Sequence, residues 1–428
     1  MSRARYLPRR ALWPIVAEGF LSRLSFGIIS FALPLFAHRL GMSLGEIGLL
    51  LSLNLAVAIA LKIPFGWLAD RIGLKSAFTA AIALRSIVSL LLVVASAPWQ
   101  LYAIRTLHGV SIALRDPPTN ALIAEIGGKK TVASSFAWYQ TAKTLAGSLG
   151  RGATGVLLTV SGSRFSLVFG IAFALSALPL LAATRVHEPA PPAMRGPAPP
   201  APDQEPEPPA PRQRLFRYAS LGFLVTGTAY LVASLFPILA VEYAELSEAA
   251  AGSLYILAAV LSLSGPLWGW LSDHVSRPLV LAIRSVGNVG SSLLYLVAPG
   301  LIGFATGKAL DDLGKAAFRP AWGAVMADVA SDDPHHRARA MGALSASEDA
   351  GEVAGPIVGG LLWATGGVAA LLLARIALAV ATETYAVLLT RSTDRRPIKQ
   401  KRPHALTGHP MHDDHHEQLD ASTGAPGR

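Results

Sequence analysis

The sequence predicts an all-α polytopic membrane protein whose helices form two parallel six-helix bundles, and three observations lead to this class. Hydrophobic residues make up 52% of the 428-residue chain and charged residues only 15%. Apolar runs of about 20 residues recur, and each can cross a hydrocarbon core of about 30 Å as a helix. The first half of the chain also repeats in the second. Open strands would leave backbone groups unsatisfied in lipid, so helices are the expected spanning element.

The apolar runs divide the chain into twelve predicted helices in two groups of six. The first group, in residues 1–185, covers 12–36, 45–69, 74–96, 99–126, 131–159 and 164–184. The second group, in residues 214–391, covers 214–240, 247–272, 277–298, 300–329, 338–363 and 367–390. A Pro- and Ala-rich cytoplasmic linker at 186–213 separates the groups, and a basic, His-rich tail at 392–428 follows them. Neither segment has the composition to pack a core, so both are expected to be disordered.

The basic start MSRARYLPRRALWP resembles the beginning of a secretory leader. However, the apolar segment behind it carries Glu18 and Arg23, and no small-residue cleavage site follows a short apolar core. We therefore expect this segment to be retained as the first membrane helix.

Lysine and arginine gather in one set of predicted loops, which gives the expected orientation. With the N-terminus inside, the cytoplasmic segments hold Arg3, Arg5, Arg9, Arg10, Arg71, Lys75, Lys129, Lys130, Arg277, Arg337 and Arg339. The opposite loops hold only Arg39 and Arg164. The positive-inside rule places both termini in the cytoplasm of a bacterial-type inner membrane. This bias accounts for much of the net charge of +10, so the sequence indicates a lipid bilayer as partner and no nucleic acid.

Composition and motifs argue against an enzyme. The chain has no cysteine, which excludes disulfides, Cys-ligated zinc and thiol catalysis. It has no Walker A pattern, so it has no ATPase of its own, and it has neither a nucleophile elbow nor a metal-binding helix motif. We expect no cofactor.

The two groups of helices are related by an internal repeat. An offset of 203 residues pairs Pro34 with Pro237, Gly66 with Gly269, Asp70 with Asp273, Pro117 with Pro320, Ala121 with Ala324 and Glu125 with Asp328. With one residue inserted, Gly147 pairs with Gly351 and Gly155 with Gly359. Halves that repeat in the same sense predict a binding site between them near the bilayer midplane.

The segment GWLADRIGLK, at 66–75, resembles the signature between the second and third helices of the major facilitator superfamily, and GWLSDHVSRP, at 269–278, resembles its weaker copy. The matching positions are Gly66, Asp70, Arg71, Gly73 and Lys75 in the first copy and Gly269 and Asp273 in the second, where His274 and Ser276 depart from the pattern. The resemblance implies the major facilitator fold and a cluster that latches the halves in one conformational state and breaks in the other.

Two further motifs resemble patterns of this family. In LYAIRTLHGVSIA, Arg105 and Gly109 match the pattern of the fourth helix while His108 replaces a glutamine, which implies a coupling role for Arg105. GEVAGPIVGG, from Gly351, resembles the glycine-proline motif that antiporters of the family carry on the fifth helix. Here the fifth-helix counterpart, GSLGRGATGV, has Arg151 and no proline, which argues against assigning export.

Ionisable residues at membrane depth are costly and are usually functional or paired. The candidates for a cavity that binds substrate or protons are Arg105, Arg115, Asp116, Lys143 and Arg151 in the first half and Lys308, Asp311, Asp312, Lys315, Arg319, Glu348, Asp349 and Glu352 in the second. Helical spacing predicts one stripe over 308–319, with Lys308 paired to Asp312 and Asp311 to Lys315. The first half contributes mostly cations and the second half acids. Such a bipolar cavity favours a charged, polar or metal-bound solute.

The same groups can instead pair with each other as gates between the halves, and both roles stay open. Lys62 and Glu352 are the expected gate. Glu348 and Glu352, one helical turn apart, are candidates for carrying a coupling proton.

The leading hypothesis is a secondary transporter that moves a small charged or polar solute by alternating access, coupled to protons. The tail holds His404, His409, His412, His415 and His416 beside acidic residues, donors that suit transition metals, although without zinc-type spacing. With the charged helices, it resembles the iron-associated facilitator proteins of magnetosome membranes (MamH-type), which implies iron or another metal as cargo. The alternatives are a drug or organic-solute transporter and a non-transporting scaffold or sensor.

Overall fold

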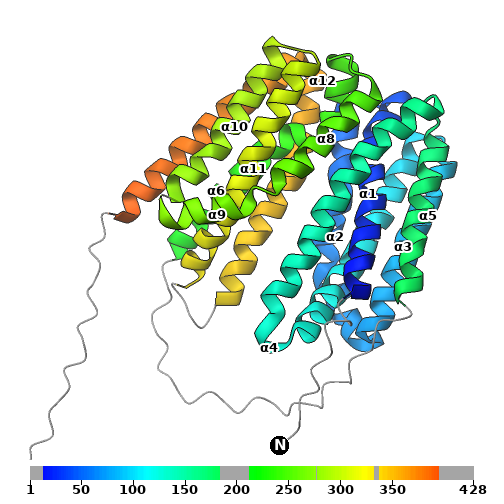
Figure 1. Ribbon diagram of the computed structural model, residues 1–428, viewed down its shortest axis with the longest axis horizontal. Coiled ribbons are helices and arrows are strands. Elements are labelled where there is room, and N and C mark those ends of the chain that lie inside the picture. Colours follow the sequence, from blue (N-terminus) through cyan, green and yellow to red (C-terminus); the bar gives the residue numbers. More distant parts are fainter. Residues whose placement is uncertain (1–12, 184–211, 276, 332–336, 395–428) are drawn as a thin grey trace, which may run out of the picture.

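The computed structural model describes residues 13–183, 212–275, 277–331 and 337–394, which form two helical bundles side by side (Figure 1). The first bundle contains α1 (Trp13–Arg39), α2 (Leu44–Ile72), α3 (Leu74–Val94), α4 (Pro98–Ser161) and α5 (Phe165–Ala183). The second contains α6 (Arg212–Ala233), α7 (Phe236–Ile238), the π-helix η2 (Leu239–Tyr243), α8 (Glu248–Ser262), α9 (Gly265–His274), α10 (Arg277–Val297), α11 (Leu301–Ala330) and α12 (Arg337–Asp394). The all-α fold class is confirmed, and the described residues contain no strand.

Six stretches of the described chain are long and apolar enough to cross a membrane, judged by length and composition alone. They are Trp13–Arg39, Leu44–Ala69, Leu74–Val94, Gln213–Tyr243, Leu279–Val297 and Ala340–Leu389. The apolar helices Phe165–Leu181 and Glu248–Leu261 are shorter. The charged helices α4 and α11 do not meet this criterion, because ionisable residues interrupt their apolar runs.

The element α4 is helical over 64 residues but folds back on itself. A straight helix of that length would measure roughly 96 Å, about three times the thickness of the hydrocarbon core. Near its start, Tyr102 donates to the carbonyl of Glu46, and near its end, Thr159 accepts from the amide of Ala249. Both ends of α4 therefore lie at the same end of the molecule, so α4 supplies the two antiparallel spans predicted at 99–126 and 131–159.

The 58-residue α12 also comprises two of the predicted spans. Gly367 interrupts it with φ of 73°, a left-handed conformation that a residue without Cβ adopts readily. Two predicted helices, by contrast, are broken. The span predicted at 214–240 ends as α6 and restarts at Phe236, next to Pro237, while the span predicted at 247–272 is divided into α8 and α9. Proline lacks the amide that would continue the helical hydrogen bonds, and it lies in the first turn of both restarted helices.

The two bundles meet mainly at one end, here called the far end, where the chain reverses at 40–43, 162–164 and 244–247. The opposite end, with residues 66–75, is called the motif end. Glycines let α2 approach α12 and α4 approach α8: a Cβ on Gly48 would lie 2.2 Å from the carbonyl oxygen of Pro356, and one on Gly155 would lie 2.1 Å from that of Glu248. Ser52 also donates to the carbonyl of Val353 at 2.7 Å. Small residues at these crossings allow the close backbone packing that stabilises membrane helix pairs.

Candidate functional site

The repeated motif has the same structural surroundings in both bundles. A Cβ on Gly66 would lie 4.0 Å from Pro117, and one on Gly269 would lie 3.6 Å from Pro320. These contacts preserve the 203-residue offset, so the internal repeat is confirmed at this point. Both glycines allow the motif helix to pack against a proline-bearing helix of its own bundle.

The rest of the signature is described only in part. Gly73 ends α2 with φ of 88°, Lys75 follows in the first turn of α3, and the exposed Arg71 lies over the ring of Trp67 at 3.6 Å. The side chains of Asp70 and Asp273 lie outside the described residues, so the predicted latch stays a prediction.

A buried ion pair holds α1 to α4 in the first bundle. Arg115 donates through Nε to Glu18 Oε1 at 3.0 Å and through its terminal nitrogen to Oε2 at 2.7 Å. The same guanidinium donates to the hydroxyl of Tyr139 at 2.9 Å, while Ser22 donates to Glu18 at 2.7 Å. Glu18 is fully buried, so its charge is neutralised within the bundle. Lys143, also predicted for the cavity, lies 5.0 Å from the ring centre of Tyr139.

Arg105 is buried and joins α4 to α2. It donates to the carbonyls of Leu50 at 3.1 Å and Leu51 at 2.7 Å and to the amide oxygen of Asn54. His108, one helical turn away, contacts the same guanidinium at 3.4 Å. These contacts place Arg105 in a helix junction, and the coupling role that the resemblance implies stays a prediction.

A second buried ion cluster lies within the second bundle. Asp311 of α11 pairs with Arg375 of α12 at 2.5 Å and with Arg284 of α10 at 3.4 Å. Arg375 also donates to Asn288 at 2.9 Å and to the hydroxyls of the neighbouring serines of α10. The predicted pairing of Asp311 with Lys315 is therefore wrong, because two arginines from neighbouring helices hold this carboxylate. The predicted pairing of Lys308 with Asp312 is confirmed.

Tyr255 of α8 lies where the two bundles meet. The guanidinium of Arg151, from the first bundle, lies 4.8 Å from its ring centre, and Lys308, from the second, lies 5.0 Å from it. Tyr255 also packs edge-on against Phe31 and Phe236, one from each bundle. The face of one aromatic ring thus interacts with a cation from each half of the protein.

Around this ring the two bundles bring together a group that we call the central site: Arg23, Arg151, Tyr230, Tyr255, Lys315 and Glu352. Arg23 interacts electrostatically with Arg151, Tyr230 and Glu352. Glu352 interacts with Tyr230 and Lys315, and Lys315 in turn with Arg151. Arg23 and Lys315 both lie near the middle of their helices, α1 and α11, at the depth expected for the midplane. All of these side chains except Tyr255 keep partial solvent accessibility.

The remaining predicted residues lie on the motif-end side of the central site. Asp349 interacts with Lys62 and with Asp116, and Glu348 interacts with Asp349 and Arg319. The expected gate between Lys62 and Glu352 stays a prediction: no described ion pair joins them, and the acid with which Lys62 interacts electrostatically is Asp349. Asp116 also pairs with Arg115 at 3.8 Å, and Arg319 is exposed.

Metal binding finds no support in the part of the chain that the structure describes. No group of three His, Asp or Glu side chains there is arranged to hold an ion. The tail histidines His404, His409, His412, His415 and His416 lie outside the described residues.

Several central residues were missed as site residues by sequence reasoning. Glu18 and Arg23 are charges inside the first apolar run, and Arg284 and Arg375 are charges inside two of the last helices. The cost of an ionisable group in lipid is the signal that could have found all four. Tyr230 and Tyr255 carry no comparable sequence signal, since tyrosines are ordinary in membrane helices.

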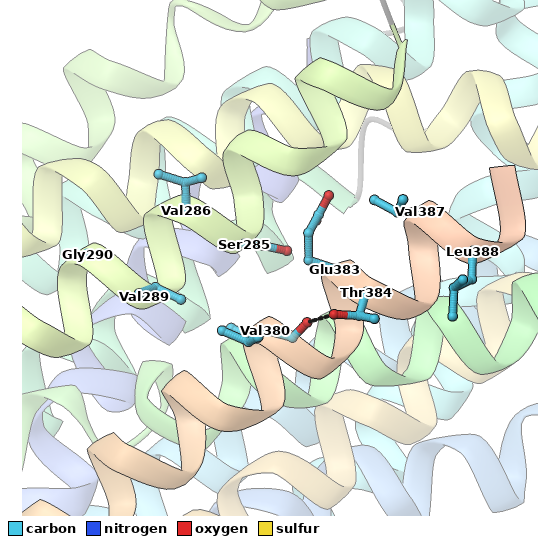
Figure 2. Close-up of a pocket in the computed structure, with 10 residues that line it drawn as sticks. Ser285, Val286, Val289, Gly290, Val380, Glu383, Thr384, Val387 and Leu388 are labelled. Carbon is cyan, nitrogen blue, oxygen red and sulfur yellow. Dashed lines mark hydrogen bonds between the residues drawn. The ribbon is translucent and has the colours of Figure 1, made fainter. Parts of the chain in front are cut away.

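A separate groove lies on the outer side of the second bundle, between α10 and α12 (Figure 2). It has a volume of about 590 Å³ and is lined mainly by apolar residues, including the exposed Val286 and Val380. Figure 2 shows Glu383 standing from α12 into the groove, with Thr384 beside it. The apolar lining is that of a lipid-facing surface, and no residue of the central site lines the groove.

Comparison with known proteins agrees with this architecture. The family model described as Major Facilitator Superfamily matches residues 18–307 and 219–413, two overlapping stretches that cover most of the chain. The chain belongs to the major facilitator superfamily. It is therefore a membrane transporter of small solutes and not an enzyme.

Relatives with assigned names match only part of this major facilitator protein. The protein named "Putative multidrug resistance protein MdtD" from Yersinia enterocolitica is 32% identical over 143 residues, which is 33% of this chain and 29% of the relative. Its counterpart from Klebsiella pneumoniae is 36% identical over 119 residues, 28% of this chain and 25% of the relative. The match thus spans less than a third of these relatives.

Solved structures match this facilitator over nearly its whole length at low identity. A bacterial homolog of the human lysosomal transporter Spinster, in an inward-facing and unoccupied conformation, gives a TM-score of 0.71 at 17% identity, covering 91% of this chain and 98% of that one. A peptide transporter POT in complex with sulfate gives 0.71 at 15% identity, covering 92% and 97%. At such identity these similarities show the fold.

Proposed function

We propose that this protein is a secondary transporter that moves a small organic solute across the membrane by alternating access. The observation that carries the proposal is the central site, where partly accessible charged side chains of both bundles face each other at mid-depth. Charged groups at membrane depth are costly, and they are found where they line a pathway for a solute or ion or where they form an ion pair. A site made by both halves changes shape when the halves move, as alternating access requires.

The contacts between the bundles support a state closed at the far end. Glu248 accepts from Ser163 at 2.9 Å and pairs with Arg39 at 3.8 Å. Between described residues, the hydrogen bonds and the ion pair that cross the halves lie at or toward this end. Toward the motif end, Lys62 and Asp349 interact electrostatically across the halves without a described ion pair, and the contacts of Gly66 and Gly269 are made within one bundle. The central site would then be reached from the motif end in this state.

An organic solute is favoured over a metal. Aromatic side chains accompany the charges of the central site, and an organic body can pack against them. The partial similarity to proteins named for multidrug resistance points the same way. Neither these relatives nor the described side chains support the magnetosome resemblance or an iron cargo.

The test uses the full-length protein purified in detergent and then reconstituted in vesicles. Thermal unfolding is measured with organic cations, organic anions, neutral drugs, ferrous iron and manganese, because a ligand that binds only the folded state raises stability with its concentration. Compounds that raise the unfolding temperature are then tested for saturable flux. Flux of an organic compound is expected; flux of metals alone would overturn the organic-solute proposal. Binding or folding without any flux would support the scaffold hypothesis.

Proton coupling is part of the proposal, with Glu352 as the carrier. Its carboxylate interacts with Tyr230 and with the cations Arg23 and Lys315, so gain or loss of a proton changes the charge balance of the site. Glu352→Gln is expected to abolish uptake driven by a pH gradient while retaining exchange of solute in both directions. Gradient-driven uptake that survives in the variant would rule out this role.

A further inference from the structure

The cations inside the two bundles fall into two groups, those that are paired with a carboxylate and those that are not. Arg115 is neutralised by Glu18, Arg284 and Arg375 by Asp311, and Lys308 by Asp312. Arg23 and Arg151 differ from these cations. Among the residues that the structure describes, no carboxylate forms an ion pair or a hydrogen bond with either of them. The Nε of Arg151 is buried without any hydrogen-bond partner.

The surroundings of Arg23 and Arg151 offset their charge only weakly. Arg23 lies 4.8 Å from the ring centre of Phe26, and Arg151 lies 4.8 Å from that of Tyr255. These arginines also repel each other, and Arg151 interacts with a further cation, Lys315. An aromatic ring attracts a cation less strongly than a carboxylate does, so these contacts leave the positive charge unbalanced.

Glycines of α4 lie beside both arginines. Gly147, next to Arg23, would place a Cβ 3.2 Å from its Nε, so a larger residue there would press on the guanidinium. Gly152, beside Arg151 in the chain, lies where the bundles meet, and an added Cβ there would clash with the side chain of Ile256 of the other bundle. The central site as defined thus holds three cations, Arg23, Arg151 and Lys315, and one carboxylate, Glu352. The nearby Asp312 also interacts with Lys315, but it is paired with Lys308, so the site is positive while Glu352 is ionised.

We propose that the central site binds an organic anion, with Arg23 and Arg151 receiving its carboxylate or a similar oxyanion and Tyr255 and Phe26 contacting its apolar body. This inference rests on the proposed transport function and adds the chemical class of the solute. A guanidinium offers a planar pair of donors that matches a carboxylate in geometry and charge. The bound anion would supply the negative charge that the protein does not provide, and Tyr255 would let both halves respond to the ligand.

The test compares ligands that share a skeleton and differ in charge. The full-length protein is mixed with benzoate, benzamide or benzylammonium, or with the corresponding naphthalene compounds. Binding is measured from the shift in thermal unfolding and by isothermal titration calorimetry. The carboxylates are expected to bind at least tenfold more tightly than the carboxamides and the ammonium compounds. Arg151→Gln is expected to weaken carboxylate binding at least tenfold and to leave carboxamide binding within twofold.

The matched control is Arg164→Gln, which removes the same charge from an exposed far-end loop and is expected to leave carboxylate binding unchanged. Arg23→Gln is the second site variant, used should Arg151→Gln fail to fold. The anion assignment would be overturned if the carboxamides or ammonium compounds bound as tightly as the carboxylates or more tightly. It would also be overturned if the carboxylates did not bind, or if they kept full affinity for the folded site variants. If the anion assignment failed in this way but a neutral or cationic solute showed flux, the transport proposal would stand. If no solute showed flux either, both the anion assignment and the transport proposal would be overturned.

Discussion

The guanidinium of Arg151, on the first bundle, lies over the ring of Tyr255, on the second, at 4.8 Å from the ring centre. This contact joins the halves at the level of the central site, while the closer glycine contacts join them at the far end. Any motion that separates the halves must break it. In the proposed mechanism, Tyr255 connects solute binding to the relative position of the bundles.

The role of the Tyr255 ring can be separated from that of its hydroxyl. Tyr255→Phe keeps the aromatic face and is expected to retain flux within about twofold, whereas Tyr255→Leu loses the two cation contacts, each worth about 0.5–2 kcal/mol. The leucine variant is expected to unfold at lower temperature and to lose flux. Parallel unfolding and flux measurements test this, and a leucine variant that matches the phenylalanine variant would show that the ring face is not used.

The buried pair of Glu18 and Arg115 is expected to be needed for folding. Glu18→Gln leaves the Arg115 guanidinium without its buried charge partner and with only the more distant and exposed Asp116, and breaking a buried pair in this way costs about 3–5 kcal/mol. Arg39→Gln, which removes an exposed far-end pair, is the control and is expected to cost about 0–1 kcal/mol. Denaturant unfolding in detergent measures both. Equal losses would mean that the Glu18 pair contributes no more than a surface pair.

That pair also allows a rescue experiment. Replacing both partners by leucine removes the unpaired charge, so the double variant is expected to be more stable than Glu18→Gln alone. A double variant less stable than the single one would indicate that Arg115 or Glu18 makes further contacts that leucine cannot replace.

The close crossing of α4 and α8 predicts a variant that cannot close at the far end. A Cβ on Gly155 would meet the carbonyl of Glu248, so Gly155→Val should hold the far end apart. The variant is expected to fold and to lose flux at least tenfold. Gly170→Val, at a position with open space around the Cβ, is the control.

The position of the far end in the Gly155 variant can be read directly by labelling. Because the chain has no cysteine, Ser163→Cys gives a single thiol at the contact with Glu248. Faster labelling of this thiol in the Gly155→Val background is expected. An unchanged labelling rate together with full flux would contradict the assigned closure.

The carboxylate of Glu383 in the lipid-facing groove is expected to reduce stability. A charge facing lipid is unfavourable by about 2.5–3.5 kcal/mol at the centre of a helix and by less near its ends. Glu383→Leu is therefore expected to raise the unfolding temperature and to leave flux unchanged, with Thr384→Val as the neighbouring control. A loss of flux in Glu383→Leu alone would assign the groove a part in transport.

Local sequence rules predicted the parts of the fold that depend on local chemistry. Apolar run length identified the spans, and the repeat identified Gly66 with Gly269 and Pro117 with Pro320 as equivalent positions, which the structure places in equivalent contacts. The four-residue spacing of Lys308 and Asp312 also sufficed to predict their pairing. Each of these features depends on residues of one helix or on equivalent places in two helices.

Long-range pairing could not be predicted in the same way. Asp311 takes its partners from α10 and α12, and the choice of Arg284 and Arg375 over Lys315 depends on how three helices pack. The central site likewise combines α1, α4, α6, α8, α11 and α12. Its free cations are recognised only once the partners of all the other charges are known.

The twin contacts of Gly66 with Pro117 and of Gly269 with Pro320 bear on the origin of the chain. Duplication of an ancestral six-helix unit would leave such a contact in both copies, and a fused pair of copies could then diverge. The buried pair of Glu18 and Arg115 has no counterpart at the 203-residue offset, where Leu221 and Phe318 stand. Arg105, by contrast, corresponds to Lys308, a cation in both copies. The shared packing would then be the older feature, and the asymmetric charges, proposed here to set solute preference, would have arisen after the two copies were joined.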